Sequence, residues 1–197
     1  MRWVVASIIL FLVPYTFITF KYRKTDKAFE PYADMKAQAN VNRLLEAGYV
    51  RSNLRAERPF PALPAKEITR GASAQSTSAP GGLPDPLDHT LIDAPRLPAS
   101  YRDLLAPAEI AALLPTKIQF TARIESDHEQ LGGAEIYIRD GSVVIVPTFE
   151  PIPDGLSART RDSNVLLTLP AGLLAPGEHA VTLAGAKGSL RWNVRVK

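Results

Sequence analysis

The chain has 197 residues, 17 prolines, no cysteine and a net charge of +3. Without cysteine, the protein cannot contain disulfides, thiolate metal sites, iron–sulfur clusters or a cysteine nucleophile. Residues 1–70 carry a net charge of +6 (12 basic against 6 acidic), 71–116 carry −3 (2 against 5), and 117–197 are neutral (9 against 9). This argues against a nucleic-acid partner, because a nucleic-acid-binding protein would carry its basic excess on the folded domain.

The first segment is a run of 18 uncharged residues from Trp3 to Phe20. As a helix, this run is about 27 Å long, close to the roughly 30 Å hydrocarbon core of a bilayer. A cleavable signal peptide has a shorter apolar core followed by small residues, whereas Lys21 and Arg23 follow closely here. We therefore predict that residues 1–24 are an uncleaved transmembrane anchor with a basic flank, and that the lipid bilayer is a partner.

The sequence contains conflicting indications of which side of the membrane the rest of the chain occupies. Four basic residues follow the apolar run, Lys21, Arg23, Lys24 and Lys27, and the positive-inside rule favours a cytoplasmic location for such a flank. A short tail, one span, a proline-rich spacer and a β-domain are instead typical of exported, signal-anchored bacterial proteins. We expect a single-pass protein with its C-terminal domain on the periplasmic or extracellular side, and the cytoplasmic alternative stays open.

Residues 30–48 are predicted to form a juxtamembrane amphipathic helix. Pro31 suits the first helical turn, and Gly48 suits a C-cap. The apolar stripe of this helix is narrow and consists of Ala33, Ala37, Val41, Leu44 and Gly48. Because such a stripe offers little area for burial, the helix needs a partner to stay ordered. We interpret it either as a docking helix for another membrane protein or as a spacer helix on the bilayer surface.

Residues 50–99 are predicted to be a largely disordered linker rich in Pro, Ser and Ala. Ten of the prolines lie between Pro59 and Pro115, and the stretch 71–86 is small, polar and flexible in composition. Residues 100–115 are predicted to form short helical turns, because Ser100 to Asp103 resembles a capping box. The apolar residues of these turns are expected to pack on the edge of the following domain: Leu104, Ile110, Leu113 and Leu114.

From residue 116 the apolar period changes from 3.6 to 2 residues. This alternation predicts six strands, at 117–124, 134–139, 142–149, 164–170, 179–185 and 189–196, with room for a seventh between Ile152 and Arg161. Asp140-Gly141 predicts a two-residue hairpin turn. Each strand has one apolar face, so we expect residues 116–197 to form an all-β domain in which two sheets pack as a sandwich.

The stretch LTLPAGLLAPGEHAVTLAGAKGSLRWNVRV (residues 167–196) resembles the end of bacterial immunoglobulin-like β-sandwich domains. In both, small residues, a Pro-Gly turn, a strand, a hairpin and a tryptophan-bearing strand follow one another. The chain lacks a cysteine pair, and Trp192 lies in the last predicted strand and not in the third. The resemblance implies an architecture and no activity.

Few residues could carry chemistry. The histidines are His89, His128 and His179, and the sequence contains no nucleophile elbow, phosphate-binding glycine loop or His-Glu-x-x-His zinc motif. The dense polar cluster Glu125–Glu129 is interpreted either as a weak divalent-cation site or, preferably, as a solvated hairpin tip.

Aromatic side chains could line a sugar-binding face, and the candidates are Phe120, Tyr137, Phe149 and Trp192. The alternation places Trp192 with the apolar set, which favours a core position. We therefore name no catalytic, cofactor-binding or metal-binding residue, expect no cofactor and no small-molecule substrate, and do not expect an enzyme.

The leading functional hypothesis is a single-pass, membrane-anchored, non-enzymatic interaction or scaffolding protein of the bacterial cell envelope, whose partner is another membrane or envelope protein. One alternative is an accessory subunit of a respiratory or transport complex, bound through the two N-terminal helices. Another alternative is a carbohydrate- or ligand-binding module.

Overall fold

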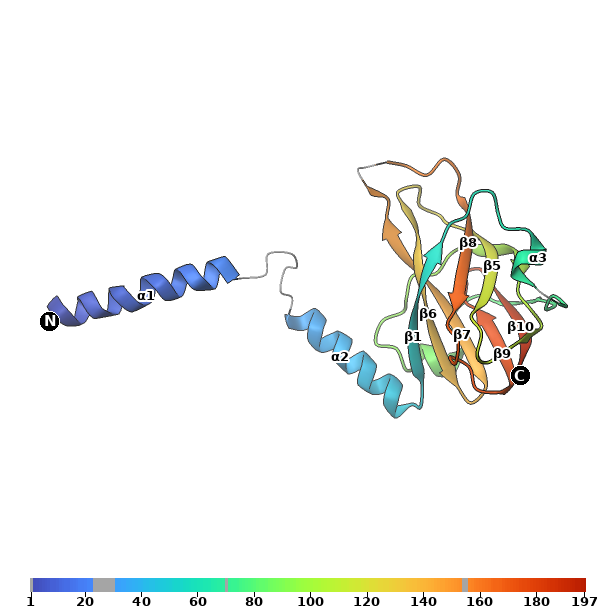
Figure 1. Ribbon diagram of the computed structural model, residues 1–197, viewed down its shortest axis with the longest axis horizontal. Coiled ribbons are helices and arrows are strands. Elements are labelled where there is room, and N and C mark those ends of the chain that lie inside the picture. Colours follow the sequence, from blue (N-terminus) through green and yellow to red (C-terminus); the bar gives the residue numbers. More distant parts are fainter. Residues whose placement is uncertain (1, 23–30, 70, 154–155) are drawn as a thin grey trace. The chain divides into compact units, whose positions relative to one another are not determined.

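The computed structural model describes residues 2–22, 31–69, 71–153 and 156–197 (Figure 1). The chain divides into two compact units, Met1–Ala37 and Gln38–Lys197. The first unit contains helix α1 and the beginning of helix α2. The second unit is a β-domain that contains the end of α2 and the rest of the chain.

Helix α1 spans Arg2–Tyr22, so the helix predicted for the uncharged run is confirmed. Pro14 lies inside this helix and has no backbone N–H to donate to the preceding turn. Close to it, the Thr16 hydroxyl donates a hydrogen bond of 2.7 Å to the carbonyl of Leu12.

Most of the side chains of α1 that the structure describes are apolar. Nine large apolar side chains of α1 are exposed to solvent: Trp3, Ile8, Leu10, Phe11, Leu12, Val13, Tyr15, Phe17 and Ile18. Among the residues described, no helix has both the length and the apolar character required of a membrane span. Most of the predicted basic flank, Arg23, Lys24 and Lys27, lies outside the described residues.

Helix α2 spans Pro31–Glu46, and its C-terminus is built by a glycine. Gly48 has φ +77°. The N–H of Gly48 donates to the carbonyl of Leu45 (3.0 Å), and the N–H of Tyr49 donates to the carbonyl of Leu44 (2.8 Å). This pair of bonds is the Schellman motif, so the predicted C-cap at Gly48 is confirmed. Leu44 and Tyr49 are both buried in one cluster with residues of the β-domain, which makes the end of α2 part of that domain.

Ten strands are described in the β-domain. They are β1 (Val50–Glu57), β2 (Thr77–Pro80), β3 (Ser100–Leu105), β4 (Glu109–Ile110), β5 (Thr116–Arg123), β6 (Glu129–Arg139), β7 (Ser142–Pro151), β8 (Asp162–Leu169), β9 (Gly177–Leu183) and β10 (Gly188–Val196). Two helical turns, α3 (Ala65–Ile68) and α4 (Asp85–Asp88), lie between β1 and β3. The strand order is β2-β10-β9-β7-β6-β1-β8-β5-β3, and β4 pairs with β10.

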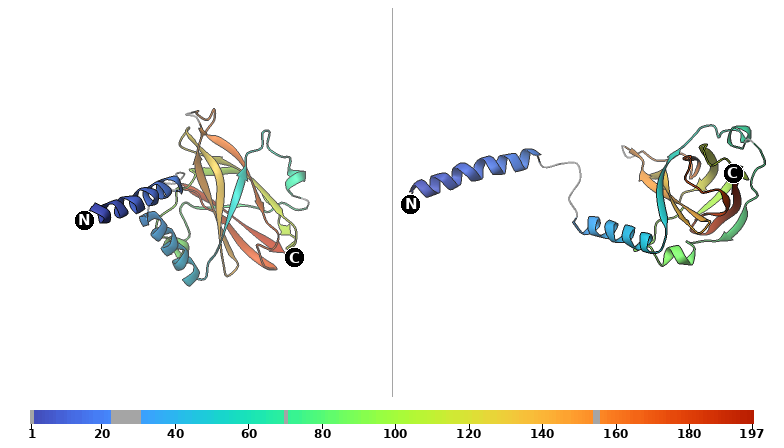
Figure 2. Two further views of the ribbon diagram at one scale, coloured as in Figure 1. Left: turned by 60° about the vertical axis from the view of Figure 1, so that its left-hand side comes forward. Right: turned by 60° about the horizontal axis from the view of Figure 1, so that its bottom comes forward.

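Strand β1 connects two ladders into one sheet. One ladder is β6-β7-β9-β10-β2, and the other is β8-β5-β3. Residues 50–55 of β1 pair antiparallel with β6, and Ala56 and Glu57 pair with β8. The sheet is curled, as the two views of Figure 2 show. In the turn between β9 and β10, the N–H groups of Ala186 and Lys187 donate to the carbonyls of Pro98 and Ala99, just before β3, at 2.8 and 3.0 Å. These bonds tie one end of the strand order to the other.

The main hydrophobic core lies on the concave face of the curled sheet. Both ladders contribute buried side chains to it, among them Phe120 and Val165 from one ladder and Ile136, Ile145 and Trp192 from the other. A second cluster covers the outer face of the sheet and consists of Leu44, Tyr49, Leu87, Leu91, Tyr137, Val144, Val146 and Ala184. Strand β7 is therefore buried on both faces, which explains its nearly continuous apolar sequence.

The prediction of a largely disordered linker over residues 50–99 is wrong. This segment contains β1, α3, β2 and α4, and Leu87 is completely buried in the outer cluster. Two hydrogen bonds between the Gln119 side-chain amide and the backbone of Leu63 (3.0 and 3.2 Å) hold the proline-rich stretch of residues 58–64. The β-domain consequently begins near residue 38, and the predicted start at 116 is also wrong.

The prediction of helical turns over residues 100–115 is wrong as well. Residues 100–105 form β3, which pairs with β5, and residues 109–110 form β4, which pairs parallel with β10. The backbone bonds gained along β5 outweigh the local capping signal. Leu104 and Ile110 pack on the core as expected, whereas Leu113 and Leu114 are exposed.

The six predicted strands are confirmed as β5 to β10, and the all-β class is confirmed with them. Both Asp140 and Gly141 have positive φ (48° and 76°), as their hairpin turn requires. The described residues between Ile152 and Arg161 form no strand. Hydrogen bonds join the two ladders through β1 into a single curled sheet, which differs from the two separate sheets expected.

Candidate functional site

A polar pocket lies on the outer face of β9 and β10. Side chains alternate along these strands, so Val181, Leu183, Leu190 and Trp192 face the main core. The residues between them face outwards, and Thr182 and Arg191 stand directly opposite each other in the β9–β10 register. Thr182 and Ser189 are buried, and together with Arg191 they form the strand side of the pocket.

The other side of the pocket is the segment Pro80–Pro86, which crosses this face of the sheet. The N–H of Gly82 donates to the carbonyl of Gly185 (2.9 Å), and the hydroxyl of Ser189 donates to the carbonyl of Gly82 (3.4 Å). A side chain at position 81 would bring its Cβ to within 2.3 Å of the Ala186 carbonyl oxygen. Glycine is thus required where this segment meets the sheet.

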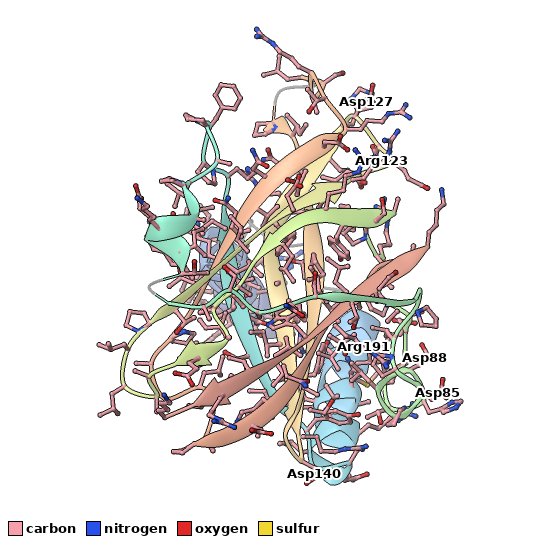
Figure 3. The ribbon with its side chains drawn as sticks, turned by 90° about the vertical axis from the view of Figure 1, so that its right-hand side faces the viewer. Asp85, Asp88, Arg123, Asp127, Asp140 and Arg191 are labelled. Carbon is pink, nitrogen blue, oxygen red and sulfur yellow. The ribbon has the colours of Figure 1, made fainter. Side chains whose placement is uncertain are left out.

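The pocket has a volume of about 420 Å³, and two opposite charges line it. They are the carboxylate of Asp85, from α4, and the guanidinium of Arg191, from β10. Among the described residues, neither group takes part in a hydrogen bond or an ion pair of its side chain. Figure 3 shows Asp85, Asp88 and Arg191 near one another on one side of the domain, away from Arg123 and Asp127. This arrangement can bind a ligand that carries both signs of charge.

The predicted polar cluster Glu125–Glu129 does not converge on one point. Glu125 accepts a hydrogen bond from Lys187 (3.0 Å), and Glu129 forms a two-fold ion pair with Arg96 (2.6 Å for each bond). These hydrogen bonds from basic side chains lower the pKa of both carboxyl groups. Over the described residues, no group of three or more carboxylate or imidazole side chains could hold a metal ion.

The aromatic residues considered for a sugar-binding face lie mostly in the interior. Phe120, Tyr137 and Trp192 are buried, and Trp192 faces the main core as its place in the alternation predicts. Phe149 is partly buried at the edge of that core, where the guanidinium carbon of Arg96 lies 5.1 Å from its ring centre. These four residues are therefore not brought together on one exposed face.

The three histidines lie in separate places. His89 follows α4, and its carbonyl accepts a hydrogen bond from Arg43 (2.7 Å). His128 lies in the exposed loop before β6, where its ring contacts the hydroxyl of Ser157 (3.4 Å). His179 is buried at the start of β9, with its Nε2 bonded to the carbonyl of Ala175 (2.7 Å) and its Nδ1 without a partner.

The pocket was not predicted from the sequence, because its residues come from two distant segments that the sequence gives no reason to connect. The glycines and prolines of the stretch 80–86 are typical of a flexible spacer, and Arg191 is one of several polar residues on an alternating strand. A signal was present in Leu83 and Leu87, which are spaced as neighbours on a helical turn and anchor the segment in the outer cluster.

Comparison with known proteins finds no match to any protein family, to any curated protein or to any solved structure.

Proposed function

We propose that this chain is a membrane-anchored, non-enzymatic interaction or scaffolding protein of the bacterial cell envelope, with its β-domain as the interacting part. The observation that carries this proposal is helix α1, whose nine large apolar side chains are exposed to solvent. Seven of them are Val, Leu, Ile or Phe, and moving each of these seven from water into an apolar phase is favourable by about 1.5–3 kcal/mol. A lipid bilayer would provide that phase along the whole uncharged run of 18 residues.

We also propose that the β-domain is related to bacterial immunoglobulin-like domains. The support for this relation is the sequence of the last two strands together with a core to which both ladders contribute. It implies only how the domain is built, and the partner of the domain must be recognised by its surface.

Membrane fractionation of cells that express the full chain tests the anchor. We expect the wild-type protein to sediment with membranes and to resist alkaline carbonate, which releases proteins bound only to the membrane surface. The variant Leu10→Arg/Leu12→Arg should move to the soluble fraction, because an arginine at the centre of a span costs about 2.5–3.5 kcal/mol.

The matched control is Leu113→Arg/Leu114→Arg, which adds the same two charges at exposed leucines of the β-domain. This control should stay with the membranes. If carbonate releases the wild-type protein, α1 does not span the membrane and the protein is attached only to the membrane surface. If the α1 variant sediments like the control, α1 is not the anchor.

We further propose that the β-domain lies on the periplasmic or extracellular side. A phosphatase that is active only outside the cytoplasm, fused after Lys197, should then be active in intact cells. A second reporter, which is active only in the cytoplasm, can be fused at the same position. Its activity would instead support a cytoplasmic β-domain, the orientation that the basic flank favours.

An accessory subunit of a respiratory or transport complex is a second candidate, because α2 exposes Met35, Val41 and Leu45. These side chains remain exposed although Leu44 packs on the β-domain. The variant Val41→Ala/Leu45→Ala should then lose co-purification with the complex while the β-domain stays folded. A truncation after Arg58 is a poorer test, since it would remove the strands with which β1 pairs.

A further inference from the structure

We propose that the pocket between β9–β10 and the segment Pro80–Pro86 binds a small zwitterionic ligand, either an amino acid or a short peptide with free ends. The ligand carboxylate would bind Arg191, and its ammonium group would bind Asp85. This inference does not rest on the membrane anchor, because every residue involved belongs to the β-domain.

Arg191 is available for a ligand, whereas the next arginine on the same face of β10 is not. Arg195 forms an ion pair with Glu178 of β9 (2.5 Å). Thr182 occupies the corresponding place opposite Arg191, so the neighbouring strand offers a hydroxyl and no carboxylate. A guanidinium group presents a planar set of N–H donors that matches a carboxylate in a two-fold hydrogen bond.

The segment side of the pocket favours a group that donates hydrogen bonds. Pro80, Pro84 and Pro86 have no backbone N–H, so this side of the pocket offers few hydrogen-bond donors to a ligand. The carboxylate of Asp85 adds negative charge to the same side. An ammonium group, which has three donors and no acceptor, is the natural complement of such a surface.

The two charges line one pocket without forming an ion pair, so the nitrogens of Arg191 and the carboxylate oxygens of Asp85 are more than 4.0 Å apart. A molecule that inserts between them can satisfy both. A volume of about 420 Å³ accommodates one or two amino-acid residues. The residues that line the pocket include no aromatic ring on which a sugar could stack, which favours a zwitterion over a carbohydrate.

The test is a thermal-shift and calorimetric titration of the full chain in detergent micelles. The probes are alanyl-alanine, free alanine, N-acetyl-alanyl-alanine, which lacks the ammonium group, and alanyl-alanine amide, which lacks the carboxylate. We expect saturable binding of the zwitterionic probes and at least a tenfold loss of affinity for either blocked dipeptide, because a hydrogen bond to a charged group is lost. If alanyl-alanine binds more tightly than free alanine, the ligand is a peptide. If free alanine binds more tightly, the ligand is an amino acid.

Variants connect the binding to the pocket. Arg191→Gln and Asp85→Asn should each reduce the affinity for alanyl-alanine at least tenfold. The controls Arg195→Gln, on the same strand face, and Asp88→Asn, on the same helical turn, should bind like the wild type. The melting temperature without ligand shows whether each variant is folded.

Three results would overturn the proposal. They are the absence of saturable binding of both zwitterions, equal binding of the blocked and free dipeptides, and full affinity in folded Arg191→Gln protein. None of these results bears on whether α1 anchors the chain, which the fractionation experiment measures separately.

Discussion

Replacing Leu44 by alanine tests whether the end of α2 is part of the β-domain. Leu44 is 2% exposed, and it packs with Tyr49 and Leu87 in the outer cluster. The substitution removes three buried carbon atoms, worth about 2.4 kcal/mol at about 0.8 kcal/mol each. The cavity left behind raises the expected loss to about 3 kcal/mol, within the 2–5 kcal/mol typical of such changes.

The matched control is Leu45→Ala, one position further along the same helix, where the side chain is 65% exposed. Both substitutions change helix propensity equally, so the difference between them reports burial alone. Urea denaturation of the full chain, followed by tryptophan fluorescence, should show a lower midpoint for Leu44→Ala and a change below about 0.5 kcal/mol for Leu45→Ala. Equal midpoints for the two variants would refute the assignment of α2 to the β-domain.

Further predictions concern the C-cap, a buried hydroxyl and pH. Gly48→Ala should destabilise the domain by about 1 kcal/mol, because alanine is strained at φ +77°, whereas Gly71→Ala, with no atom within 4 Å of its Cβ, should be neutral in the same urea assay. Tyr101→Phe should cost about 1–3 kcal/mol by leaving the buried carbonyl of Ala184 without its hydrogen bond, and a loss below 0.5 kcal/mol would contradict this contact. Burial raises the pKa of Tyr101 and Tyr137, and the hydrogen bond to a glutamate adds to the effect at Tyr137. Unfolded tyrosine ionises near pH 10 while the folded side chains stay protonated, so stability should fall above pH 10 by about 1.4 kcal/mol per pH unit for each tyrosine. The ion-paired surface glutamates have lowered pKa values, so their contribution should be present at neutral pH and disappear as the pH falls below about 4.5; urea midpoints measured between pH 3 and 11 check both limits.

The sequence predicted those elements whose pairing is local. The strands from β5 to β10 have an alternating or continuously apolar pattern, and most pair with a neighbour in the chain. Asp140 and Gly141 define their turn within two residues, because both can adopt positive φ. The fold of residues 116–197 as strands therefore followed from short-range chemistry.

Strands β1 and β3 were not predictable in the same way. Strand β1 has the sequence VRSNLRAE and buries only Leu54 and Ala56, so its apolar signal is weak. Its partner β6 lies about 80 residues further along the chain. Strand β3 has a polar sequence that resembles a helix start, and Asp103, with φ +52°, lies where its register with β5 shifts. Long-range backbone pairing overrode local propensity in both cases.

The candidate site was beyond sequence reasoning for a related reason. The charges of Asp85 and Arg191 are 106 positions apart, and only the curled sheet and the burial of Leu87 bring their segments to one pocket. A stretch rich in glycine and proline, such as residues 80–86, has the same composition whether it is a flexible spacer or the fixed wall of a pocket. The difference lies in one buried leucine and one backbone hydrogen bond from Gly82.

The position of β1 has a mechanical consequence. Tension that enters the β-domain from the N-terminal side reaches β1 directly after Tyr49, at a strand in the interior of the strand order. Its six pairs with β6 and two pairs with β8 would be loaded together along the strand. An edge strand, by contrast, peels away one hydrogen bond at a time. The chain therefore enters the sheet at a point suited to resist pulling, and extraction of β1 would separate the two ladders and open the core.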